Sequence, residues 1–272
     1  MRDHSLPRFA AGIDPGPSFV DLLRQVAPHQ LPGAGLASAP TEVLEVAHGT
    51  TVVAIRSASG VVMAGDRRTT AGYAIASRRI EKVFPADDYS GVAIAGAAGP
   101  AIDLVKLFQT QLEHYEKVEG VHLSLEGKAN QLAMLVRANL SAAMMGFVVV
   151  PLFAGYDRHR DHGRVFSYDV TGGRYEELDY QANGSGSVHA RNWVKAGWHE
   201  ALASDDAVEL AIRSLFAAAD EDAATGGPDL VRRIFPSLAI VDADGYRALG
   251  DDEVEARAQA LLGGPERGGS PR

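Results

Sequence analysis

The chain has 272 residues, a formal net charge of −9 and no cysteine, which excludes disulfide bonds and thiolate metal sites. Its acidic balance without a basic stripe argues against nucleic acid as a partner. No apolar run approaches the ~20 residues of a membrane span, and the charged N-terminus lacks the apolar core of a secretory signal. These features predict a cytoplasmic protein without a membrane partner.

Residues 1–49 differ from the rest of the chain, because they carry six prolines. Only residues 19–26 show apolar positions at helical spacing, and prolines on both sides keep that stretch short. We therefore expect a mostly irregular segment outside the folded core.

From Thr51 onward, short apolar runs indicate strands, and apolar residues three or four positions apart indicate helices. The expected strands are 51–56, 61–65, 80–84, 91–95, 147–154, 164–169, 174–178, 237–241 and 246–248. The expected helices are one that opens at Gly99-Pro100 and those at 126–145, 187–202, 206–221 and 251–262. Because strands and helices come in blocks instead of alternating singly, the order predicts an antiparallel α+β layered fold. It would form one domain over 50–262, and residues 263–272 would be a disordered tail.

The junction His48-Gly49-Thr50-Thr51 stands where the irregular segment meets the first strand. If the chain is cut after Gly49, Thr50 carries a nucleophilic hydroxyl and a free α-amine on one residue. The amine can take the hydroxyl proton, so base and nucleophile lie together. Its reference pKa of about 7.7–8.0 suits a general base at neutral pH. Thr51 is the rival N-terminus.

Further residues follow at separated positions, each of which alone has an ordinary structural reading as a turn, strand end or loop. Lys82 shares a face with Ile80 and Phe84 in an alternating segment, which predicts an inward ammonium that needs a counter-charge, and Asp66 is the natural partner. The motifs are Asp66 after the run Gly60–Gly65, Lys82 in Arg79–Phe84, Gly96 before Ala97-Ala98-Gly99-Pro100, Ser185 in Gly184–Ser187, and Asp222 with Thr225 in Asp222–Asp229.

Taken in this order, the motifs resemble those of the catalytic β subunit of the 20S proteasome. The actinobacterial form is most similar, since its propeptide also ends in His-Gly before Thr-Thr. The resemblance runs from about residue 45 to about 250, and its spacing fits only when Thr50 is the first mature residue. It implies an N-terminal nucleophile hydrolase fold, a four-layer αββα sandwich of two antiparallel sheets flanked by helices. Residues 1–49 would be a propeptide, removed by autocatalytic cleavage at Gly49-Thr50.

The resemblance also implies roles for the site residues. Thr50 would be the nucleophile, Lys82 with Asp66 would lower the pKa of its hydroxyl, and the N–H of Gly96 would hold the oxyanion. Around the amine the family places hydrogen-bonding residues that match Ser185, Asp222 and Thr225, of which Thr225 departs from the serine that is frequent there. No metal or organic cofactor is implied.

By position, the resemblance places six residues around the pocket for the substrate residue before the cut, and Thr70 with Ala98 against the substrate backbone. Because five of the six are apolar and none is charged, we expect cleavage after large apolar or aromatic residues. The six are Thr69, Ile80, Phe84, Ile94, Ala98 and Ile102.

The implied partners are proteasome α subunits, further β subunits in stacked heptameric rings, and an ATP-dependent unfoldase that acts through the α rings. Substrates would be peptides and unfolded or tagged proteins. Two alternatives are an HslV-type threonine peptidase, which the long propeptide disfavours, and a non-catalytic ring subunit, which would not need Thr50, Asp66 and Lys82. A metal site at His159 and His162 is a weaker reading than a solvated hairpin loop.

Overall fold

The computed structural model describes residues 49–262. The predictions for the proline-rich segment before Gly49, including a helix over 19–26, and for the tail 263–272 lie outside the described residues.

Two five-stranded antiparallel sheets form the centre of the molecule, with strand orders β10-β1-β2-β11-β12 and β5-β6-β7-β8-β9. The first sheet contains β1 (Thr51–Arg56), β2 (Gly60–Gly65), β10 (Tyr180–Gly184), β11 (Ser237–Asp242) and β12 (Gly245–Ala248). The second contains β5 (Val83–Asp87), β6 (Ser90–Gly96), β7 (Val149–Asp157), β8 (His162–Tyr168) and β9 (Arg174–Glu177). A separate hairpin pairs β3 (Thr69–Ala71) with β4 (Ala74–Ser77).

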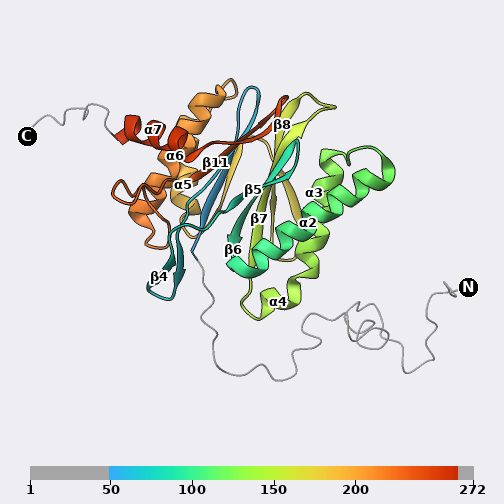
Figure 1. Ribbon diagram of the computed structural model, residues 1–272, viewed down its shortest axis with the longest axis horizontal. Helices are drawn as coiled ribbons and strands as arrows, with labels where there is room; N and C mark the ends of the chain where they lie inside the picture. The colour runs from blue at the N-terminus through green and yellow to red at the C-terminus, as the bar shows by residue number, and fades with distance from the viewer. Residues whose placement is uncertain (1–48, 263–272) are drawn as a thin grey trace, which may run out of the picture.

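Helices cover the outer face of each sheet, so the four layers are αββα, and the predicted fold class is confirmed (Figure 1). The second sheet is covered by α2 (Ala98–Glu119) and α3 (Leu125–Ala138), which α4 (Leu140–Met144) follows. The first sheet is covered by α5 (Ser187–Gly197) and α6 (Ser204–Glu221), with α7 (Asp251–Leu262) beside them.

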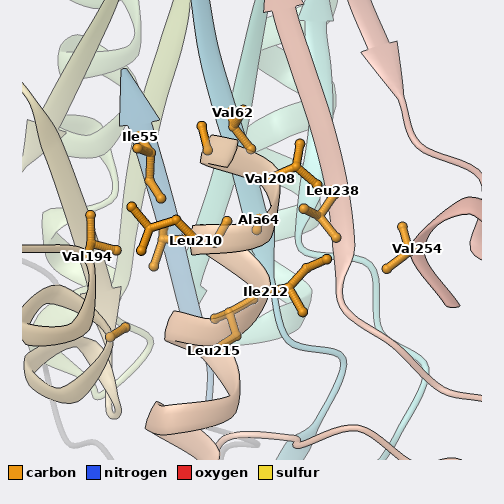
Figure 2. Close-up of a cluster of buried hydrophobic side chains, with 14 of the residues drawn as sticks. Ile55, Val62, Ala64, Val194, Val208, Leu210, Ile212, Leu215, Leu238 and Val254 are labelled. Atoms are coloured by element: carbon orange, nitrogen blue, oxygen red, sulfur yellow. The ribbon is translucent and has the colours of Figure 1, made fainter. Parts of the chain in front are cut away.

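Both faces of the inner strands are buried, which explains why β1 and β2 are continuous apolar runs instead of alternating ones. In β1, Val52 and Ala54 point toward the second sheet, whereas Val53 and Ile55 point toward α6. Figure 2 shows this second set, in which Ile55, Val62 and Ala64 of the sheet meet side chains of α6. The side chains that α6 contributes there are Val208, Leu210, Ile212 and Leu215.

The register of the first sheet brings three chain segments to one end of the sandwich. Because β1 and β2 are antiparallel, with Val52 opposite Gly65, the start of β1 and the end of β2 are neighbours. Thr51 is also opposite Gly184, so the end of β10 lies at the same place. Thr50, Asp66 and Ser185 each stand one residue beyond these strand ends.

The structure corrects several predicted boundaries. The helix expected over 126–145 is two helices, α3 and α4, with Asn139 as the C-cap of the first and the N-cap of the second. The helix expected over 187–202 ends at Gly197, after which Trp198 is extended and its Nε1 donates to the Arg56 carbonyl.

Four strands differ from the sequence prediction: β5 begins later than expected, and β3, β4 and β10 were missed. The strand expected over 80–84 begins only at Val83. The Lys82 carbonyl still accepts the Ile94 N–H of β6 at 2.9 Å, but Ile80 and Glu81 bind Arg67 instead of a neighbouring strand. The hairpin of β3 and β4 and the edge strand β10 were not predicted.

Candidate active site

The backbone on both sides of Thr50 is fixed by hydrogen bonds to neighbouring segments. Its carbonyl accepts the Ser185 N–H at 2.9 Å, and the Thr51 N–H donates to Asp66 Oδ1 at 2.7 Å. The Thr51 carbonyl in turn accepts the Asp66 N–H at 3.1 Å. Thr50 itself is 5% exposed, so the Gly49-Thr50 bond is held in a buried and defined place.

Gly49 has a backbone conformation that an L side chain rarely adopts, with φ of +116°. A Cβ added there would stand 2.7 Å from Thr70 Oγ1 and 3.1 Å from the Ala224 carbonyl oxygen. The residue before Thr50 must therefore be glycine for the backbone to follow this path.

The Gly49 carbonyl oxygen accepts two hydrogen bonds from side chains. The Thr50 hydroxyl donates to it at 2.6 Å, and Lys82 Nζ donates to it at 3.2 Å. A hydroxyl and an ammonium therefore both lie at the carbonyl group that precedes Thr50. This arrangement puts a nucleophile beside that carbonyl and a positive charge beside its oxygen.

Lys82 and Asp66 form the ion pair that the sequence led us to expect. Lys82 is 1% exposed, and its Nζ donates to Asp66 Oδ1 at 2.6 Å and to the Arg68 carbonyl at 2.5 Å. With the bond to Gly49, these contacts use all three hydrogens of an ammonium. Burial lowers the pKa of Lys82, and the Asp66 carboxylate opposes that effect.

Asp66 is fully buried and accepts hydrogen bonds from four groups, which satisfies its charge. Its Oδ1 binds Lys82 Nζ and the Thr51 N–H, and its Oδ2 binds the N–H groups of Arg68 and Gly226, both at 2.8 Å. Four segments of the chain thus meet at one carboxylate.

A second network lies on the carboxyl side of Thr50. Asp222 Oδ2 accepts the Ser185 hydroxyl at 2.5 Å and the Thr225 hydroxyl at 2.6 Å. Ser185 Oγ also reaches the Thr50 carbonyl at 3.4 Å. Although burial alone would raise the pKa of Asp222, hydrogen bonds from Ser185, Thr225 and the Ala224 N–H lower it. The structure thus joins Ser185, Asp222 and Thr225 to one another and to Thr50.

Thr51 belongs to this network, although the sequence suggested it only as a rival N-terminus or as the first residue of the strand. It is fully buried, its Oγ1 lies 2.6 Å from Thr225 Oγ1, and it accepts the Gly186 N–H at 2.9 Å. The signal that could have found it is the second hydroxyl of the Thr-Thr pair. Ala224 and Gly226 contribute only backbone groups, for which the sequence carries no signal.

Gly96 is the last residue of β6, opposite Val149 of β7. Its φ is +119°, and a Cβ would stand 2.0 Å from the Val148 carbonyl oxygen, so only glycine fits. Since β6 also packs against β1, Gly96 lies in the sheet that faces the Thr50 sheet. Its role as an oxyanion donor stays a prediction.

The seven residues predicted to contact substrate, six around the pocket and Thr70 against the substrate backbone, lie in three parts of the fold. Phe84, Ile94 and Ile102 pack into the apolar cluster beneath α2 and α3. Thr69 and Thr70 lie in β3, and Thr70 Oγ1 is near Gly49, 2.7 Å from the position that a Cβ of that residue would occupy. Ala98 is the first residue of α2, and Ile80 precedes β5, where its N–H donates to the Arg67 carbonyl. Their contact with substrate stays a prediction.

Within residues 49–262, no group of three or more His, Asp or Glu side chains is placed to hold a metal ion. His159 lies in the turn between β7 and β8 and His162 is the first residue of β8, while Asp157 at the end of β7 binds Arg164 at 3.0 Å. In the same described part of the chain, no helix is long and apolar enough to cross a membrane.

The proteasome subunit family model matches residues 46–231. The chain belongs to the proteasome subunit family. The proteasome subunit beta of Acidimicrobium ferrooxidans is 56% identical over 257 residues, which cover 94% of this chain and 93% of that protein. The proteins of the same name from Streptomyces griseus and Frankia alni are each 53% identical over 254 residues, or 93% of this chain and 90% and 92% of theirs. The resemblance to actinobacterial proteasome β subunits is thereby confirmed.

Membership in the proteasome family also accounts for the sheet arrangement, since two antiparallel sheets flanked by helices are what the resemblance implied. The family match begins just before Gly49, at the point where the described structure also starts. It therefore includes Thr50, Asp66, Lys82, Gly96 and the network around Asp222.

Proposed function

We propose that this chain is the catalytic β subunit of a 20S proteasome, a threonine endopeptidase made as a precursor and cut between Gly49 and Thr50. One observation carries the proposal. The Thr50 hydroxyl and the Lys82 ammonium both donate to the carbonyl oxygen of Gly49, at 2.6 and 3.2 Å. Residues 1–49 would then be the propeptide, 50–262 the catalytic domain and 263–272 a tail.

In self-processing, Thr50 Oγ attacks the Gly49 carbonyl carbon and forms an ester bond. The Gly49–Thr50 C–N bond breaks, and the proton of the hydroxyl ends on the nitrogen, which becomes the free α-amine. Water then hydrolyses the ester and releases residues 1–49. The Lys82 ammonium stabilises the negative charge that develops on the Gly49 oxygen, because it donates to that atom.

In peptide hydrolysis, the Thr50 hydroxyl attacks the carbonyl carbon of the substrate and the Thr50 amine takes the hydroxyl proton. The Gly96 N–H holds the oxyanion, and the amine returns the proton to the leaving nitrogen of the substrate. Water, deprotonated by the same amine, cleaves the acyl-enzyme. Lys82 favours the reaction because its positive charge lowers the pKa of the hydroxyl.

The same proposal supplies the partners. The chain would assemble with proteasome α subunits and with further β subunits in heptameric rings, in the cytoplasm, and an ATP-dependent unfoldase would deliver unfolded or tagged proteins through the α rings. The names of the relatives, proteasome subunit beta, support assembly with other proteasome subunits. No metal or organic cofactor takes part in the proposed steps.

The test is the intact mass and N-terminal sequence of the chain after co-expression with its α partner. We expect a mature N-terminus at Thr50 and turnover of fluorogenic peptides. The Thr50→Ala variant should keep residues 1–49 and have no peptidase activity.

Three outcomes would count against the proposal. A mature N-terminus at any other residue would overturn the assignment of Thr50. An assembled particle that keeps its N-terminal segment and lacks activity would favour the non-catalytic ring subunit. Full activity without an α partner would favour the HslV-type peptidase.

A further inference from the structure

Residues 66–68 contact residues 80–82 at four points. Two were described above, where Lys82 Nζ binds the Asp66 carboxylate and the Arg68 carbonyl. The other two belong to Arg67, whose carbonyl accepts the Ile80 N–H at 3.2 Å and whose Nη1 binds Glu81 Oε1 at 2.9 Å. Arg67 therefore binds the two residues that come directly before the catalytic lysine.

The guanidinium of Arg67 is held from a second side as well. Its Nη2 donates to Oδ1 of Asp251, the first residue of α7, at 2.7 Å. The Arg67 side chain is 17% exposed, whereas those of Glu81 and Asp251 are 48% and 75% exposed. The planar fork of arginine suits this position, since it can bind two carboxylates at once in a fixed geometry.

These contacts close the base of a long excursion of the chain. Between Arg67 and Glu81 the chain leaves the first sheet, forms the β3–β4 hairpin and returns to β5 in the second sheet. The hairpin projects beyond the sheets (Figure 1), and its Tyr73 is fully exposed. Among residues 69–79, Thr70 comes close to Gly49. The ion pair of Arg67 with Glu81 thus joins the two ends of a segment that supplies part of the site.

We propose that Arg67 is a positioning residue for Lys82, which it keeps at the Gly49-Thr50 junction by fixing Ile80 and Glu81. The inference rests on the proposed function, because it assigns to Lys82 a part in the reaction. No hydrogen bond or ion pair of Arg67 reaches Thr50 or Gly49, so it acts through the backbone that carries the lysine.

The expected effect is moderate. Ion pairs with exposed carboxylates contribute little individually, and the Lys82–Asp66 pair does not involve the Arg67 side chain. We therefore expect Arg67→Gln to fold and assemble, and to lower kcat by about five-fold, with a change in KM of less than about two-fold. Processing of the precursor should slow by a similar factor.

The experiment uses the particle co-expressed with its α partner. Intact mass gives the extent of processing, and kcat and KM are measured on fully processed particles with one fluorogenic peptide. Arg247→Gln is the matched control, because Arg247 binds Glu253 of the same helix α7 at 3.1 Å. It should retain the wild-type kcat.

Two further variants separate positioning from a purely structural role. Glu81→Gln should lower kcat as much as Arg67→Gln does, and the double variant should lose no more than either single one. The charge exchange R67E with E81R should recover part of the kcat.

The proposal is overturned if processed Arg67→Gln particles have the wild-type kcat and only a lower yield or melting temperature. It is also overturned if Arg247→Gln loses as much kcat, or if Asp251→Asn reproduces the loss while Glu81→Gln does not. The proposed function fails separately. In that case wild-type particles keep residues 1–49 or show no turnover. If instead the wild type is active, Lys82→Ala is inactive and Arg67→Gln is normal, only the positioning role is contradicted.

Discussion

The conformation of Gly49 yields the sharpest prediction, because one added methyl group should slow self-processing. Gly49→Ala forces a non-glycine residue to a φ of +116° and brings its Cβ to 2.7 Å from Thr70 Oγ1 and 3.1 Å from the Ala224 carbonyl oxygen. A left-handed conformation costs a non-glycine residue about 1–2 kcal/mol. The hydroxyl of Thr70 can rotate away, whereas the backbone oxygen of Ala224 can move only if the chain around it shifts.

The residue therefore leaves this conformation, and the Gly49 carbonyl moves away from the Thr50 hydroxyl and the Lys82 ammonium. At about 1.4 kcal/mol for each factor of ten, the strain alone lowers the population of the reactive geometry about 5- to 30-fold.

The assay follows the precursor and mature bands with time after mixing with the α partner, and intact mass identifies each. Gly146→Ala is the control for strain away from the site, since Gly146 has a φ of +94° and nothing within 4 Å of an added Cβ. It should process at the wild-type rate. Adding Thr70→Ala to Gly49→Ala should recover only part of the rate, because the backbone strain stays. Wild-type processing by Gly49→Ala would refute the reasoning.

Four more predictions follow from the site. Lys82→Ala should abolish peptide turnover and slow processing, and near-normal hydrolysis of a fluorogenic peptide would contradict the mechanism. Asp66→Ala should impair assembly as well as activity, since it leaves a buried ammonium unpaired at a cost of about 3–5 kcal/mol, and gel filtration of the particle measures this. Thr51→Val should destabilise the chain by about 1–3 kcal/mol in thermal unfolding, because the Gly186 N–H and the Thr225 hydroxyl lose a partner, and unchanged stability would exclude this role. A panel of peptides that differ only in the residue before the cut should be cleaved fastest after Tyr or Leu, and faster cleavage after Arg or Asp would disprove the apolar pocket.

The strands and helices that the sequence predicted best are those with the strongest apolar pattern. β1, β2 and α6 bury apolar side chains at nearly every inward position, so their type and bounds could be predicted closely. The edge strand β10 and the β3–β4 hairpin are built mostly from polar or small residues, of which only Thr69 and Ala182 are buried. Their pairing depends on neighbouring strands and not on their own composition, so no local pattern indicated them.

The candidate site divides in a similar way. Asp66 and Lys82 could be predicted because a buried ammonium requires a counter-charge and the family spacing singles out the pair. Arg67 could not, since one of its partners, Asp251, lies 184 positions away along the chain. In the sequence, Arg67 is one of two adjacent arginines, and nothing nearby in the sequence indicates this contact. It forms only because the fold places α7 beside the end of β2.

The proposed cleavage would remove one acceptor of Lys82. In the structure, the three hydrogens of the ammonium bind Asp66 Oδ1, the Arg68 carbonyl and the Gly49 carbonyl. Asp66 and Arg68 stay with the chain after the proposed cleavage, whereas Gly49 leaves. The third hydrogen would then turn toward Thr50, whose hydroxyl shares the same carbonyl oxygen in the structure. The cut that creates the Thr50 amine as a base would therefore also turn the lysine from the scissile oxygen to the nucleophile, so one buried ion pair would serve both reactions.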